Sequence, residues 1–145
     1  MEVYTIGFTQ KTAAEFFGAL KQAGVKRLLD VRLNNSSQLA GFAKRKDLSF
    51  FLKEICNIDY MHEPLLAPTQ DLLNSYKKNK GRWQDFEERF LHLMSERKVE
   101  EKFDQNFFSV KTVLLCSEAK PNHCHRRLIA EYLRTKWGDL KIVHL

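Results

Sequence analysis

Short apolar runs alternate with helical patterns along the first third of the chain. Val3–Ile6 is a short apolar strand that Gly7 stops. Over Thr12–Ala23 the apolar residues recur at helical spacing, and Gly24 is a typical C-terminal cap. Lys26–Val31 (KRLLDV) is a second buried-type strand. One helix between two strands predicts a parallel pair with a right-handed crossover.

The middle of the chain begins with a polar segment. Residues 33–46 are rich in Asn, Ser, Lys and Arg and predict a loop. Asp47 is the expected N-cap of a helix that runs to Cys56, because its apolar positions share one face. Ile58–Met61 predicts a third strand, which Pro64 closes.

The pattern continues to the carboxyl terminus. We expect helices near Gln70–Asn79 and Arg82–Glu96, and the broad apolar stripe of the second one is interpreted as core. Lys111–Cys116 and Lys141–Leu145 predict two further strands around a helix at Cys124–Trp137. This alternation predicts an α/β fold, a single three-layer domain over residues 1–145 with a mostly parallel sheet flanked by helices.

Composition fits an ordinary cytoplasmic protein. The chain has 145 residues, 43% hydrophobic and 29% charged, which suits one domain with a proper core. We find no signal-peptide pattern and no apolar run near the roughly 20 residues that cross a bilayer, so no membrane partner is expected. The three cysteines are too few for a disulfide scaffold and are expected to be reduced: Cys56, Cys116 and Cys124.

The net charge of +6 favours anionic partners without identifying one. A small anionic ligand or a nucleotide is the partner we expect first. Nucleic acid is the alternative, with the Asn34–Lys46 loop against its backbone. The sequence does not determine an oligomeric state.

Polar residues gather where the predicted strands end. In an open parallel sheet, ligands bind outside the carboxyl ends of the strands. Side chains two positions apart on a strand emerge on the same side, which pairs Asp30 with Arg32 and Cys116 with Glu118. The residues that end strands one, two and four are Gly7, Thr9, Asp30, Arg32, Cys116 and Glu118.

The loop after Glu118 delivers a second group to the start of a helix. Cys124, His125 and Arg126 stand there. Helix N-terminal N–H groups favour a thiolate, and the same position favours a bound anion that Arg126 would grip. We therefore expect one site where both groups meet.

Structural interpretations stay open for each residue. Asp30 and Arg32 could simply pair with each other, and Glu118 could only form a salt bridge with Arg126. Cys116, at the end of an apolar strand, could be a buried small residue.

Several known chemistries do not fit. A phosphatase-type loop needs Arg six positions after the Cys, where Ala130 stands, and the segment after Ile6 lacks the glycines of a phosphate-binding loop. Soft donors do lie close together, but their C-x7-C-H spacing lacks a C-x2-C pair, and adjacent residues rarely aim at one ion. We predict no metal and no other cofactor.

Three segments resemble the DUF488 family, a domain of unknown function in bacteria and archaea. They are YTIGFT (4–9), LLDVR (28–32) with Ser37 and Phe42 after it, and LLCSEAKPNHCHRRLIAEYL (114–133). The chain departs from the family pattern at Thr9, where Ser is usual, at Asn34–Asn35, where Pro is usual, and after Met61. The resemblance implies an α/β fold with clustered motif residues, namely Asp30, Arg32, Cys116, Glu118, Cys124, His125 and Arg126. It implies no activity.

The leading hypothesis is an enzyme that acts on an anionic substrate, with nucleotides and nucleic acids among the candidates. Arg32 and Arg126 would hold the anion, and Cys124 would be the reactive thiolate. His125 or Glu118 would be general acid/base. The other assignments are Asp30 as the residue that orients Arg32 or a histidine, and Gly7, Thr9 and Cys116 as substrate-binding residues. The alternative is a non-catalytic module that binds an anion or nucleic acid.

Overall fold

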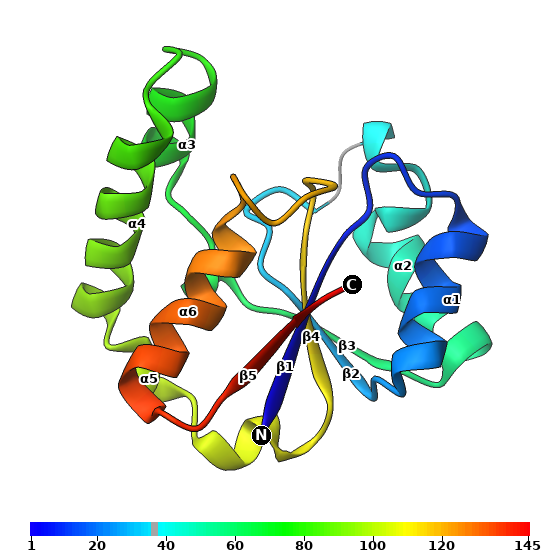
Figure 1. The fold of residues 1–145 in the computed structure, drawn as a ribbon. Helices are drawn as coiled ribbons and strands as arrows, with labels where there is room; N and C mark the ends of the chain where they lie inside the picture. Colours follow the sequence, from blue (N-terminus) through cyan, green and yellow to red (C-terminus); the bar gives the residue numbers. More distant parts are fainter. Residues whose placement is uncertain (36–37) are drawn as a thin grey trace.

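The computed structural model describes residues 1–35 and 38–145 and shows five strands in one parallel sheet (Figure 1). The strand order is β3-β2-β4-β1-β5. The register sets Gly7 beside Cys116 and Asp30 beside Leu115, so β1, β2 and β4 end at one edge. The strands are β1 (Glu2–Gly7), β2 (Arg27–Asp30), β3 (Asp59–His62), β4 (Thr112–Cys116) and β5 (Lys141–His144).

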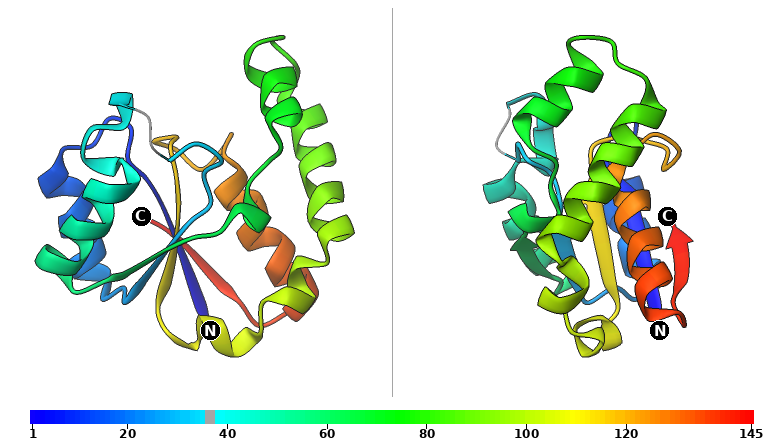
Figure 2. Two further views of the ribbon diagram at one scale, coloured as in Figure 1. Left: turned by 180° about the vertical axis from the view of Figure 1, so that it is seen from behind. Right: turned by 90° about the vertical axis from the view of Figure 1, so that its left-hand side faces the viewer.

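Helices cover both faces of the sheet, which confirms the predicted α/β fold (Figures 1 and 2). One face is covered by α1 (Ala13–Ala23) and α2 (Arg45–Phe51). The opposite face is covered by α3 (Gln70–Lys77), α4 (Trp83–Arg97), α5 (Val99–Lys102) and α6 (His125–Trp137).

The central strand β4 shows how the sequence builds both layers. All five of its residues are buried, and successive side chains point to opposite faces. Val113 and Leu115 pack in the α1–α2 layer, whereas Leu114 and Cys116 pack in the α3–α6 layer. The last residue of the strand, Cys116, therefore faces α6.

The cap predicted at Asp47 is wrong. The N-cap is Lys44, three residues before Asp47, and it makes no side-chain cap bond. Asp47 lies in the first helical turn, where it forms an ion pair with Lys44 at 3.7 Å. The predicted end is confirmed, because a π-helical turn continues α2 over Leu52–Cys56.

Four short helical segments in the described residues were not predicted, one of them a 3-10 turn at Pro64–Leu66. Gln38–Ala43 forms 3-10 turns inside the segment expected to be a loop, with a kink at Gly41. The helix α5 and a 3-10 segment at Gln105–Ser109 lie between α4 and β4. Ser37 of the family pattern lies outside the described residues.

No helix in the described part of the chain is long and apolar enough to cross a membrane.

Candidate functional site

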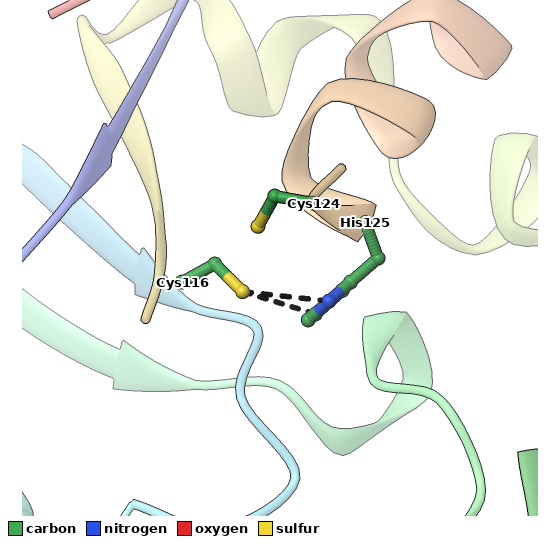
Figure 3. Close-up of side chains that lie close together, drawn as sticks. All are labelled: Cys116, Cys124 and His125. Carbon is green, nitrogen blue, oxygen red and sulfur yellow. Dashed lines mark hydrogen bonds between the residues drawn. The ribbon is translucent and has the colours of Figure 1, made fainter. Parts of the chain in front are cut away.

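The start of α6 brings two side chains toward the end of β4. Cys124 is the N-cap residue in extended conformation, and His125 is the first helical residue. The change of backbone conformation between them turns both adjacent side chains toward Cys116 (Figure 3). Their sulfur and ring-nitrogen atoms lie within 4.8 Å of one another.

This arrangement contradicts the argument that adjacent residues rarely aim at one point. All three side chains are buried, and two thiols with one imidazole are donors that Zn²⁺ prefers. Among the described residues, this is the one group of three or more such side chains close enough to hold a metal ion.

Hydrogen bonding fixes the tautomer of His125. Its Nε2 lies 2.7 Å from the carbonyl oxygen of Val31, which can only accept, so Nε2 carries the proton. Burial lowers the pKa of His125, and its ring is therefore neutral near pH 7. Its unprotonated Nδ1 faces the Cys116 sulfur at 3.4 Å and can accept the thiol proton.

The two thiols differ in how readily they ionise. Burial opposes ionisation of Cys116, but a hydrogen bond from Cys124 and the backbone N–H groups after the strand outweigh it and lower the pKa of Cys116. Burial raises the pKa of Cys124 well above the ordinary thiol value, and the neighbouring Cys116 raises it further. Cys116 is therefore the more acidic thiol, although helix position favoured Cys124.

Arg126 is fully buried and holds the loop that follows β4. Its Nη1 donates to the carbonyl of Glu118 at 2.6 Å and its Nη2 to that of Ala119 at 3.5 Å, whereas its Nε has no partner. Within the described residues no carboxylate pairs with this guanidinium. Its positive charge instead favours the thiolate form of Cys116, which is part of why the pKa of that thiol is low.

The same loop lies directly against the end of β1. A Cβ at Gly7 would meet the Glu118 carbonyl oxygen at 1.6 Å, so only glycine fits there. The backbone N–H of Thr9 donates to the Ser117 carbonyl at 3.1 Å. Gly7 and Thr9 therefore contact the loop backbone, and neither lines the pocket described below.

Asp30 and Arg32 form a buried ion pair at the end of β2. Arg32 donates from Nε and Nη2 to the two carboxylate oxygens, both at 2.8 Å. The same carboxylate also accepts from the Arg32 backbone N–H and from the Tyr60 hydroxyl, at 3.1 and 2.5 Å. Asp30 is thus fully engaged and orients Arg32, whose Nη1 forms no bond with the described residues.

A pocket of about 150 Å³ opens in front of the thiols. The predicted site residues that line it are Arg32, Cys116, Glu118, Cys124 and His125, whereas Gly7, Thr9, Asp30 and Arg126 do not line it. The carboxylate of Glu118 pairs with Lys77 of α3 at 2.8 Å, and not with Arg126 as one interpretation had it.

Sequence reasoning missed the aromatic wall of this pocket. Trp83 stacks between His123 and Phe86, with ring centroids 5.0 and 5.1 Å apart, and Tyr76 contacts its edge. Phe86 also belongs to the core, so the apolar stripe of α4 serves as core and pocket wall at once. A tryptophan at the first position of a helix, half-buried, was the available signal.

The comparisons with known proteins point to one family. No curated protein matches the chain, and no solved structure matches it. The model of the family described as "Domain of unknown function DUF488" matches residues 12–133. The matched segment contains β2, β4 and most of α6, and with them every thiol and imidazole of the pocket. The chain belongs to the DUF488 family.

Proposed function

We propose that this protein is an enzyme in which the thiolate of Cys116 attacks a small substrate held in the pocket at the end of β4. The observation that carries the proposal is the surrounding of one sulfur by groups that favour its anion. These groups are the backbone N–H groups after the strand, the Cys124 thiol and the unpaired charge of Arg126.

The roles differ from those expected from the sequence. Cys116 replaces Cys124 as nucleophile because Cys124 is the less acidic thiol. His125 receives the Cys116 proton on Nδ1 and returns it to the leaving group. Arg126 is a positioning residue that supports the thiolate and fixes the loop.

The pocket favours a substrate with an aromatic or apolar part and one anionic group. The stacked wall around Trp83 suits a planar ring. Arg32 is held rigidly by Asp30 and keeps one nitrogen, Nη1, for a phosphate or carboxylate. A nucleoside monophosphate combines both features.

A non-catalytic binding module is the second candidate. The aromatic wall and Arg32 would hold the same ligand without any reaction at the thiols. The enzyme requires a reactive Cys116 thiolate, whereas the binding module does not.

Alkylation with iodoacetamide, followed site by site through peptide mass spectrometry, tests the proposal on chelator-treated protein. We expect Cys116 to react faster at pH 7 than Cys56, whose pKa burial raises, and Cys124 to react slowest. Cys116 reacting no faster than Cys56 would refute the nucleophile and favour the binding module.

Ligand protection tests the substrate class. A nucleoside monophosphate should slow Cys116 alkylation, and the uncharged nucleoside should slow it less. Asp30→Asn/Arg32→Met removes the ion pair as a unit and should abolish this difference. Equal protection by the charged and uncharged ligands would show that the pocket does not recognise an anionic group.

A further inference from the structure

We propose that Cys116 and Cys124 form a dithiol–disulfide couple, so that the site reduces the disulfide bond of a small substrate. The inference rests on the proposed function, since Cys116 is the attacking thiolate. It adds a reaction class and gives Cys124 a chemical role.

Proximity is the first observation. Figure 3 shows the two sulfur atoms turned toward each other from the end of β4 and the start of α6. They lie within 4.8 Å of each other, and both cysteines are free thiols. A disulfide needs about 2.05 Å between the sulfurs, and the seven-residue loop 117–123, free of regular structure, lies between the two cysteines.

The capping position of Cys124 is the second observation. Helices usually begin with Ser, Thr, Asp or Asn, whose side chain binds the first free N–H groups. Cys124 makes no such side-chain bond. Its side chain faces Cys116 instead, and this orientation gives no benefit to the helix.

The reaction balances with the groups present. Cys116 gives its proton to Nδ1 of His125, and its thiolate attacks one sulfur of the substrate disulfide, forms a mixed disulfide and expels the other sulfur, which takes that proton from Nδ1. Cys124 then gives its own proton to the vacated Nδ1 and attacks the Cys116 sulfur, and the second substrate thiolate leaves and takes this proton. The substrate gains two electrons and becomes two thiols, and the cysteine pair loses two electrons and becomes a disulfide.

Contact with His125 sets the order of attack. The Cys116 sulfur faces the unprotonated Nδ1 of His125 at 3.4 Å, so Cys116 is the thiol that gives up its proton first. A dithiol such as dithiothreitol supplies the electrons that return both cysteines to thiols.

The probe is dithiobis-nitrobenzoate, an aromatic disulfide with carboxylates that suits the ring wall and Arg32. The protein is chelator-treated Cys56→Ser, in which the described pair is the whole thiol content. We expect two equivalents of the coloured thiolate, no retained adduct, and an intact mass lower by two hydrogens. A peptide that joins residues 116 and 124 should appear, and dithiothreitol should remove it.

Two matched variants separate the steps. Cys124→Ser should release one equivalent and retain one aromatic adduct on Cys116. Cys116→Ser should lose the fast release, because the remaining thiol is the less acidic one.

The outcomes distinguish the two proposals. Fast release with the adduct retained on Cys116 while Cys124 is intact overturns the couple and leaves the nucleophile standing. Absence of fast release at Cys116 overturns both the couple and the proposed function.

Discussion

The two buried arginines of the site differ in whether their positive charge has a carboxylate partner. Arg32, 3% exposed, has the Asp30 carboxylate as a two-point partner. Arg126, fully buried, has only loop carbonyls, and one of its nitrogens has no partner at all. The first charge is neutralised by its neighbour, and the second remains available to a nearby group that can become an anion, Cys116. A buried arginine next to a thiol thus indicates reactivity only when its counter-charge is missing.

The largest expected loss of stability comes from breaking the ion pair between Asp30 and Arg32. Asp30→Asn leaves Arg32 buried without a counter-charge and should lower the free energy of unfolding by about 3–5 kcal/mol in urea titrations. The control is Asp59→Asn in the exposed pair with Lys53, which should cost about 1 kcal/mol at most. Equal losses in the two variants would mean that the pair contributes no more than a surface contact.

Arg126→Met removes the buried positive charge that has no carboxylate partner. It should cost about 1–3 kcal/mol for each carbonyl left without a donor. It should also slow Cys116 alkylation at pH 7, by at most about tenfold for each unit by which the pKa of the thiol rises. Arg127 is the matched control, because it binds carbonyls of the same loop but pairs with Glu131. If Arg127→Met slows Cys116 equally, loop order and not charge controls the thiol.

Gly7→Ala tests how tightly the 117–123 loop is held against β1, and it removes no charge. The new methyl group would overlap the Glu118 carbonyl, and relief of this overlap should cost about 1–3 kcal/mol. Gly18→Ala in α1 meets open space and should raise stability by about 0.5–1 kcal/mol through helix propensity. Thermal unfolding of the two variants gives the comparison, and a neutral Gly7→Ala would show that the loop can move away.

The smallest effect is the pH dependence from His125. Its pKa in the folded protein lies below the ordinary 6.5, so folding favours the neutral ring. The resulting stabilisation is complete above pH 6.5 and is lost as the pH falls through the lower, folded-state value. The stability difference between the protein and His125→Gln should therefore narrow from pH 7 toward pH 5. Because both proteins contain His144, whose pKa burial also lowers, that contribution cancels.

Much of the fold could be predicted because the strands are short apolar runs with clear ends. The same ends located the site, since parallel strands bring Asp30 and Cys116 to one edge. The alternation of the strand residues, however, does not say which of two nearby thiols is the more acidic. That depends on burial and on N–H groups of the loop, which have no signature in the sequence.

Other details depend on contacts between distant segments. The cap at Asp47 failed because Asp is as acceptable within a first turn as before it. The direction of Arg126 follows from loop carbonyls, and the aromatic wall follows from how α3 and α4 pack beside the loop. A helical stripe of aromatic residues has the same pattern whether it faces core or pocket.

The parallel pairing of β2 with β4 has a consequence for folding kinetics. The register joins Arg27 to Thr112, so the two strands that bring Arg32 and Cys116 together are separated by most of the chain. Such pairings form late, because the long intervening segment must be ordered first. We therefore expect the thiols to acquire their surroundings late in folding, and partly folded chains to contain cysteines of ordinary reactivity.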